Sequence, residues 1–286
     1  MTGGEETAVE FRLARRIGGR GHAPHEFERT LRGIAVDDAG RVYAVGDSAV
    51  KVFGAGGEPL RQWATRLPGQ SVAVDADGRV WVGEHGQVEI HDALGTLADT
   101  WRDAGRLGLV TAIGFGRGHV FLADANARWI RRYDRNGGFL NNIGDRHRKG
   151  GFHIPNGVVD FAVDGEGTVH VANPGMHRVE RYSPDGTQLG HFGRFDGRDP
   201  AGFPGCCNPT NLALDGDGHV IVSEKAGPRV KVYSPDGQLV RVVADDVFDP
   251  AAKNMDLAVD SRGRVYVADT EALAICVFEP RAREAA

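Results

Sequence analysis

Two adjacent cysteines, Cys206 and Cys207, are the clearest candidates for metal or nucleophilic chemistry in the sequence. Thiolates bind soft metals such as copper(I) or zinc, act as nucleophiles, or join in a strained disulfide ring. The pair lies in Gly202–Asp215, GFPGCCNPTNLALD, where two prolines restrict the backbone. We expect Cys206 and Cys207 to form a catalytic or metal-binding centre, with copper or zinc as the metal.

A thiol centre of this kind needs partners, and histidines are the obvious ones. His25 and His153 stand just before predicted strands and are the best ligand candidates. No CxxC or HxxxH spacing fixes a metal site, so the alternative that both are solvated loop residues stays open.

A second group of candidates heads six similar short segments, at Gly33, Ser71, Thr111, Asp160, Asn211 and Asp256. The last three carry carboxylate or amide oxygens, which are the ligands that calcium prefers. Asp160, Asn211 and Asp256 are therefore metal-ligand candidates, with calcium as the alternative to copper or zinc. The competing interpretation is that these side chains accept backbone N–H groups at turns.

Two glutamates stand at the ends of the predicted second strands of the second and fifth repeats. Glu84 is followed by His85, and Glu224 is followed by Lys225. At the corresponding places of the other segments the chain has Gly, Asp or Asn, which commonly form turns. The longer side chains of Glu84 and Glu224 make them candidate catalytic residues.

The elements that must position these side chains repeat along the chain. Six copies of one pattern, an apolar strand, an Asp–Gly turn and an aromatic strand, occur at Gly33–Tyr43, Ser71–Trp81, Thr111–Phe121, Asp160–His170, Asn211–Ile221 and Asp256–Tyr266. Successive turn glycines are 38 to 51 residues apart. This spacing and the alternation of short strands predict an all-β six-bladed β-propeller with four-stranded blades.

The last repeat ends after its third strand, near Glu279. The N-terminal segment Val9–Gly18, VEFRLARRIG, resembles the outer strands of other repeats, so we expect it to pair with the last blade and close the ring. Residues 1–286 then form a single domain, with 1–8 and 281–286 as flexible tails. In such a ring four long segments lie on one face, which we call the upper face: Gly18–Arg32, Gly144–Val159, Arg194–Thr210 and Ala244–Met255. The functional site is expected at the upper mouth of the central channel.

The repeats resemble the NHL family of six-bladed propellers. The matching segments include His25–Asp37, Gly151–Asp164 and Gly202–Asp215, the last with three residues added between Phe203 and Pro209. The resemblance implies the fold and leaves the function open, because the family contains enzymes, RNA binders and protein-interaction platforms.

Two groups of propeller enzymes show a more distant similarity. Peptide α-amidating lyases resemble this chain but hold zinc with histidines before inner strands, where this sequence has Asn156 and, in the next repeat, the run Cys207–Asn211. Lactonase-type propellers bind calcium through Glu, Asn and Asp at the channel mouth, and the resemblance implies that Asp160, Asn211 and Asp256 do the same.

Composition narrows the function classes. The chain has 286 residues and a net charge of −5, which disfavours nonspecific nucleic-acid binding. It has neither an apolar run long enough for a membrane span nor the pattern of a signal peptide, and it has only 3 cysteines, so a cytoplasmic location is expected. Arginine outnumbers lysine 29 to 5, which indicates a bacterium of high genomic GC content.

The sequence therefore predicts a metal- or thiol-dependent enzyme of the lyase or hydrolase type that acts on a small molecule or peptide. A non-catalytic protein-interaction scaffold is the alternative. RNA binding through Arg146, His147, Arg148 and Lys149, with Arg128 and Arg131, is the least favoured hypothesis.

Overall fold

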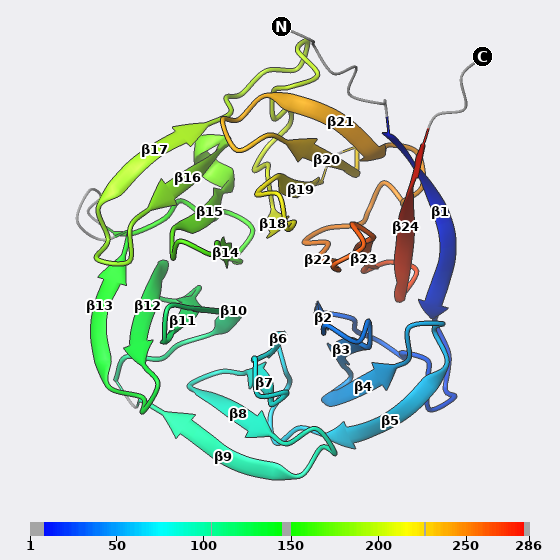
Figure 1. The fold of residues 1–286 in the computed structure, drawn as a ribbon, viewed down its shortest axis with the longest axis vertical. Helices are drawn as coiled ribbons and strands as arrows, with labels where there is room; N and C mark the ends of the chain where they lie inside the picture. The colour runs from blue at the N-terminus through cyan, green and yellow to red at the C-terminus, as the bar shows by residue number, and fades with distance from the viewer. Residues whose placement is uncertain (1–8, 104, 145–149, 226, 283–286) are drawn as a thin grey trace, which may run out of the picture.

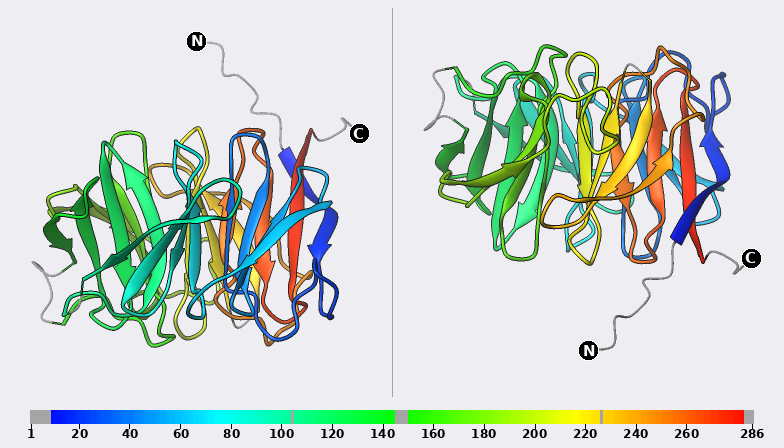
Figure 2. Two further views of the ribbon diagram at one scale, coloured as in Figure 1. Left: turned by 90° about the horizontal axis from the view of Figure 1, so that it is seen from below. Right: turned by 90° about the horizontal axis from the view of Figure 1, so that it is seen from above.

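The structure is a computed structural model that describes residues 9–103, 105–144, 150–225 and 227–282. Six four-stranded antiparallel sheets stand around a central channel, with the first strand of each repeat nearest the axis (Figure 1). Seen from the side, the ring is a thick disc with loops on both faces (Figure 2). The predicted all-β six-bladed propeller with four-stranded blades is confirmed.

The first three blades follow one another along the chain. Blade 1 contains β2 (Gly33–Val36), β3 (Val42–Gly46), β4 (Ala49–Phe53) and β5 (Pro59–Ala64). Blade 2 contains β6 (Ser71–Val74), β7 (Val80–Gly83), β8 (Gln87–His91) and β9 (Leu97–Arg102). Blade 3 contains β10 (Val110–Gly116), β11 (His119–Asp124), β12 (Trp129–Asp134) and β13 (Phe139–Ile143).

The other three blades include the one that closes the ring. Blade 4 contains β14 (Asp160–Val163), β15 (Val169–Asn173), β16 (Arg178–Tyr182) and β17 (Gln188–Phe192), with the short helix η1 (Pro174–Met176) between β15 and β16. Blade 5 contains β18 (Asn211–Leu214), β19 (Val220–Glu224), β20 (Arg229–Tyr233) and β21 (Leu239–Ala244). Blade 6 contains β22 (Leu257–Val259), β23 (Val265–Asp269), β24 (Ala274–Ala282) and, from the start of the chain, β1 (Val9–Gly18).

The ring is closed by the N-terminal strand, as predicted. β1 pairs antiparallel with β24 from Gly18 opposite Ala274 to Val9 opposite Ala282. Residues 1–8 and 283–286 of the expected tails lie outside the described residues, whereas Arg281 and Ala282 belong to β24. β1 is thus the fourth strand of the last blade.

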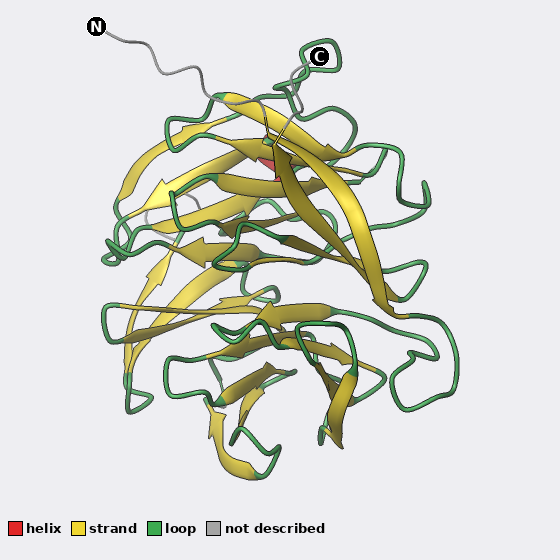
Figure 3. Ribbon diagram, turned by 45° about the vertical axis from the view of Figure 1, so that its right-hand side comes forward, coloured by secondary structure: helices red, strands yellow, loops and turns green. Residues whose placement is uncertain are grey.

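Strands form nearly all of the regular structure (Figure 3). The second strand of each blade is almost fully buried, whereas outer strands such as β5 alternate between partly buried and exposed residues because one face meets solvent. The described part of the chain holds no helix with the length and hydropathy that a membrane span requires.

The Asp–Gly hairpins on the lower face have a common geometry. In blade 2, the Asp75 carboxylate accepts the N–H groups of Asp77 and Arg79 at 3.0 and 2.9 Å and also pairs with the Arg79 side chain at 2.8 Å. Gly78 closes the turn with φ +77°, a left-handed conformation that glycine adopts without strain. These short, regular turns leave the longer loops to the upper face.

The hydrophobic core lies between adjacent blades. Between blades 6 and 1, Ile17 of β1 packs in one cluster with Phe27 and Leu31 from the following loop and with Tyr266 and Ile275. β1 therefore contributes side chains to the core as well as hydrogen bonds to the last sheet.

Ile17→Ala tests how much this closing strand contributes to stability. Because Ile17 is fully buried, we expect the free energy of unfolding to fall by about 2–5 kcal/mol, measured by urea denaturation. Arg12→Ala, an exposed change in the same strand, should alter it by less than about 0.5 kcal/mol. Equal effects of the two substitutions would contradict the role given to β1.

Candidate functional site

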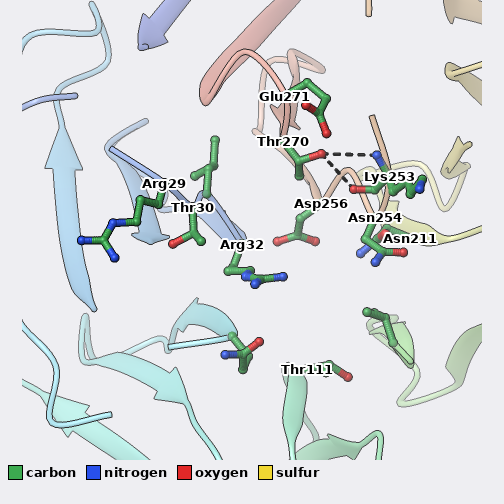
Figure 4. A pocket seen from close by; sticks show the side chains of 13 residues that line it. Arg29, Thr30, Arg32, Thr111, Asn211, Lys253, Asn254, Asp256, Thr270 and Glu271 are labelled. Atoms are coloured by element: carbon green, nitrogen blue, oxygen red, sulfur yellow. Dashed lines mark hydrogen bonds between the residues drawn. The ribbon is translucent and has the colours of Figure 1, made fainter. Parts of the chain in front are cut away.

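A cavity of about 270 Å³ lies at the upper mouth of the channel; we call it the upper-mouth cavity. Figure 4 shows Thr111, Asn211 and Asp256 at the starts of inner strands, with Arg32 and Lys253 from the preceding loops around the same space. A second cavity of about 250 Å³ follows along the channel and shares Thr111 and Asp256 with the first. These two side chains therefore lie where the mouth meets the channel.

The predicted acidic residues at the inner strands bind the backbone of the next blade. Asp256 Oδ2 accepts the N–H of Ile34 at 2.7 Å, and Asp160 Oδ2 accepts the N–H of Leu212 at 2.8 Å. Each carboxyl thus connects two neighbouring blades. The interpretation that these side chains accept backbone N–H groups is correct, but the groups belong to the next blade and not to a local turn.

The equivalent residues on the other side of the channel make similar connections. Ser71 Oγ donates to the carbonyl of Val110 at 3.0 Å, and Thr111 Oγ1 donates to the carbonyl of Val159 at 2.7 Å. At Gly33 a Cβ atom would lie 2.9 Å from the Ser71 Cα, so the approach of blades 1 and 2 excludes a side chain. The residues that head the inner strands hold the ring together around its axis.

Asp160 and Asp256 are electrostatically unusual. The pKa of Asp160 is raised well above its usual range, first by burial and then by the charge of Asp256. Burial raises the pKa of Asp256 to about 6, while N–H donors and the Asn211 side chain act in the opposite direction. Asp256 can therefore gain or lose a proton close to neutral pH, which is the property of a general acid or base.

Asn211 lies between the two carboxyls and is only 4% exposed. Among the described residues no donor reaches the Oδ1 atom of Asn211. The Oδ1 atom of Asn156 also has no donor there, although Asn156 Nδ2 donates to Asn254 Oδ1 at 2.8 Å. A buried acceptor without a partner is costly unless a ligand or water fills the position. The unpaired Oδ1 of Asn211 therefore marks the floor of the upper-mouth cavity as a place for a donor group or a cation.

Positive side chains line the rim of the same cavity. Within the described residues, the guanidinium groups of Arg29 and Arg32 and the ammonium group of Lys253 form no ion pair. Thr270 fixes the backbone of Lys253 with bonds of 3.0 and 3.3 Å, drawn in Figure 4. The Glu271 carboxylate lines the same rim, and the Arg29 guanidinium is turned away from Asp256 in Figure 4, so Arg32 and Lys253 are the cations available to an anionic group.

The two cysteines lie outside this cavity. Cys206 is exposed, Cys207 is 7% exposed, and their Sγ atoms are 3.2 Å apart. Within the described ranges, no cluster of three or more His, Cys, Asp or Glu ligand atoms includes a cysteine. The structure does not bring Cys206 and Cys207 together with His25 or His153 as one ligand set.

The two predicted histidines are exposed loop residues. His153 packs against η1, where a Cβ on Gly175 would lie 2.4 Å from its ring, and its carbonyl accepts the Gly175 N–H at 2.8 Å. Neither His25 nor His153 lines the upper-mouth cavity.

The predicted catalytic glutamates are buried in the blades. Glu84 accepts the N–H of Leu67 at 3.1 Å and the side-chain amide of Gln87, and burial raises its pKa. Glu224 forms ion pairs with Arg229 and, at 2.6 Å, with Lys231. Burial lowers the pKa of Lys231. Both carboxyls hold the upper ends of their blades, and neither lines the upper-mouth cavity.

One group on the lower face could hold a metal ion: Asp215, Asp217 and His219, whose ligand atoms lie within 4.8 Å of one another. His219 pairs with Asp215 at 2.9 Å in the place where Arg41, Arg79 and Arg264 pair with the turn Asp of their blades. His219 thus makes the same hairpin contact as these arginines. No metal identity follows from this group.

The residues proposed for RNA binding have three different settings, and Arg128 is exposed. Arg146, His147, Arg148 and Lys149 lie outside the described residues. Arg131 is buried and donates to Asp124 at 2.8 and 3.0 Å, so its guanidinium belongs to the blade.

Sequence reasoning missed the cations of the cavity. Arg32 directly precedes the strand-heading Gly33, and Lys253 and Asn254 stand shortly before Asp256. Their closeness to the repeat starts was the signal that could have identified them.

Comparisons with known proteins support the fold. No protein-family model and no curated protein matches the chain. A structural genomics protein of unknown function from Bacteroides thetaiotaomicron VPI-5482 is 17% identical, with a TM-score of 0.71 over 96% of this chain and 76% of that chain. The WD40 β-propeller domain of Doa1 is 15% identical, with a TM-score of 0.63 over 94% and 97% of the two chains. Streptogramin B lyase is 11% identical, with a TM-score of 0.61 over 95% and 98%.

At these identities the likeness shows the propeller fold alone. The fold is shared with a lyase, an interaction domain and a protein of unknown function, so it does not select among them. Membership of the NHL family stays a prediction.

The raised pKa of Asp256 predicts a dependence of stability on pH. The folded chain favours the protonated carboxyl, so the stabilising contribution is complete below the pKa of an unfolded Asp, about 3.9, and is lost as the pH rises through about 6. Asp256→Asn stays neutral and keeps an acceptor for the Ile34 N–H. We expect the unfolding free energy of this variant, relative to the parent, to rise by roughly 2–3 kcal/mol between pH 4 and pH 7.5.

Urea denaturation at a series of pH values measures this difference. Asp245→Asn, at an exposed position, is the control and should follow the parent at every pH. Parallel curves for the parent and Asp256→Asn would show that Asp256 has no raised pKa.

Proposed function

We propose that this chain is an enzyme of the lyase or hydrolase type that acts on a small anionic molecule or peptide in the upper-mouth cavity. The observation that carries the proposal is the Asp256 carboxyl, with a pKa of about 6, at the junction of two cavities. The unpaired cations at the rim and the unpaired Asn211 Oδ1 at the floor support it. The proposed centre therefore moves from Cys206 and Cys207 to Asp256.

The chain's own residues suggest how such a molecule is held. Arg32 and Lys253 bind the anionic group at the rim. Asn211 Oδ1 and Asp256 accept hydrogen bonds from a hydroxyl or amino group deeper in the cavity. A carboxylate that carries a hydroxyl or amino group nearby satisfies both ends, and its fixed orientation places one proton next to Asp256.

Asp256 then acts as the general base. In a lyase it removes a proton from the carbon next to the substrate's anionic group, and in a hydrolase it removes a proton from water. The negative charge that develops lies on the side of the cavity that holds Arg32 and Lys253, which stabilise it. The distant fold likeness to streptogramin B lyase agrees with the first alternative.

The metals that the resemblances imply differ in how well they suit these residues. Zinc bound by histidines does not fit, because Asn156 stands in the histidine place and His25 and His153 lie away from the cavity. A hard cation fits better, because Asp160, Asn211 and Asp256 offer only oxygen donors and Asn211 Oδ1 has no partner. Calcium held by these three residues would add positive charge at the junction of the two cavities, since Asn211 lines the first, Asp160 the second and Asp256 both.

The interaction-scaffold alternative rests on the fold shared with the WD40 domain of Doa1. It needs neither a proton-transferring carboxyl nor unpaired polar groups in a cavity. A scaffold would lose no binding partner when Asp256 is replaced by Asn, so the variants below separate the two functions.

The enzyme proposal is tested by measuring turnover with mass spectrometry. The panel of compounds contains hydroxy- and amino-carboxylates, their esters and lactones, and short peptides. For the substrate found, kcat/KM should rise with pH through about 6, because the base must be deprotonated. Asp256→Asn should lower kcat by about 10²–10⁴-fold. The proposal would be contradicted if no panel member bound saturably or was turned over, and if Asp256→Asn behaved in these assays like the parent.

Arg32→Gln tests recognition of the anionic group. Loss of a charge-assisted hydrogen bond should raise KM by about 10-fold or more with a smaller change in kcat. Arg12→Gln, an exposed arginine of β1 on the outside of the ring, is the matched control and should leave KM unchanged. An equal KM for the two variants would show that the anion is not held by Arg32.

A further inference from the structure

The two adjacent thiols, which lie outside the upper-mouth cavity, are arranged as a chelating pair. Cys206 and Cys207 lie in the loop between β17 and β18, and their Sγ atoms are 3.2 Å apart. Cys206 is exposed to solvent, so the pair can be reached from outside. Two sulfur atoms in contact at the surface of a fold are suited to bind one thiophilic atom together.

The loop holds the thiols in this position. Asn208 is fully buried; its Nδ2 donates to the carbonyls of Pro204 and Lys225 at 2.7 and 2.8 Å, and its Oδ1 accepts the Lys225 N–H at 2.8 Å. Cys207 itself has φ +73°, a conformation that residues other than glycine rarely adopt. A strained residue held by buried hydrogen bonds is a frequent feature of binding sites, because the site is formed before the ligand arrives.

Lys225 contributes charge as well as backbone contacts. Burial and the Cys206 thiol raise the pKa of Cys207, whereas the Lys225 ammonium acts in the opposite direction and favours the thiolate. A ligand that replaces the thiol proton binds the sulfur without leaving a free buried thiolate, and the sulfur stays beside Lys225.

A disulfide between these neighbours is disfavoured. Adjacent Cα atoms joined by a trans peptide are about 3.8 Å apart, shorter than the roughly 4.4–6.8 Å that unstrained disulfides span. Strain makes such a bond easier to reduce, so the dithiol is the stable form wherever other thiols are present.

The distance between the sulfurs selects among thiophilic ions. With metal–thiolate bonds of about 2.3 Å, a linear two-coordinate ion such as copper(I) would hold its sulfurs about 4.6 Å apart, well beyond the observed contact. A tetrahedral zinc site needs four ligands, and no His, Asp or Glu joins the cysteines in a ligand group within the described segments. An angular centre with two sulfur ligands on one side fits the pair.

We propose that Cys206 and Cys207 form a binding site for trivalent arsenic, which takes thiolate ligands in an angular, pyramidal arrangement. Each thiol replaces one hydroxyl group on arsenic, so two As–S bonds form, two As–O bonds break, and the two thiol protons leave with the hydroxyl groups as two water molecules. Arsenic keeps its oxidation state and no oxidant or reductant takes part. The site is independent of the function proposed for the upper-mouth cavity.

Phenylarsine oxide, which carries two hydroxyl groups on arsenic once water has added to it, is the probe for this site. The reduced full-length chain, kept free of oxygen, should gain about one phenylarsenic group in intact-mass measurement, and its titratable surface thiols should disappear. A small dithiol such as 2,3-dimercaptopropanol should remove the group, whereas a monothiol at equal concentration should not, because only a second chelator competes with two linked sulfurs.

Cys206→Ser and Cys207→Ser each leave one thiol in place and should bind roughly a hundredfold more weakly, since the second bond is lost. The double variant keeps the buried Cys276 and should take up no arsenical, which controls for reaction in the core. Thermal unfolding of each variant, compared with the parent, separates loss of chelation from loss of the loop.

Affinity in either folded single variant equal to that of the parent would overturn the proposal. So would two arsenicals bound per chain, or complete removal by the monothiol, because both outcomes mean that the sulfurs react separately.

Discussion

The pairing of β1 with β24 closes the ring, and the positions of all upper loops depend on this closure. A propeller blade buries its faces only against its neighbours, so an open ring would leave two blade faces and a sheet edge exposed to water. β1 removes this cost with one strand, because it completes the last sheet and places Ile17 between blades 6 and 1. The loop that follows β1 then carries Arg29 and Arg32 to the rim of the upper-mouth cavity.

Around the axis the same residues serve stability and chemistry. Asp160 and Asp256 connect adjacent blades through backbone N–H groups, and for that reason Asp160 is buried and Asp256 half-buried in a crowded position where their pKa values rise. A carboxyl at the surface of the ring would ionise normally and would have little use as a base near neutral pH. The architecture of a closed ring thus produces the electrostatic property on which the proposed function rests.

The two sets of candidate residues had different outcomes for a physical reason. Asp160, Asn211 and Asp256 occupy equivalent positions of consecutive repeats, so the symmetry of the ring necessarily brings them together. Cys206 and Cys207 lie in an added stretch of one loop, which the repeat does not position, and the histidines belong to other loops. Glu84 and Glu224 also occupy equivalent positions of their repeats, but their strand ends lie inside the blades. There Glu84 accepts the N–H of Leu67, and Glu224 forms ion pairs with Arg229 and Lys231.

The sequence by itself determined the number of blades, the position of the closing strand and the residues that begin each inner strand. These features repeat locally, with an alternation of period two and a turn glycine that needs no distant contact to be recognised. The tertiary structure alone decided that Arg32 and Asp256, 224 residues apart in the chain, share one cavity, and that Asn211 Oδ1 has no partner there. The reason is that loop length and side-chain direction, which no repeat specifies, decide what reaches the axis once the ring has closed.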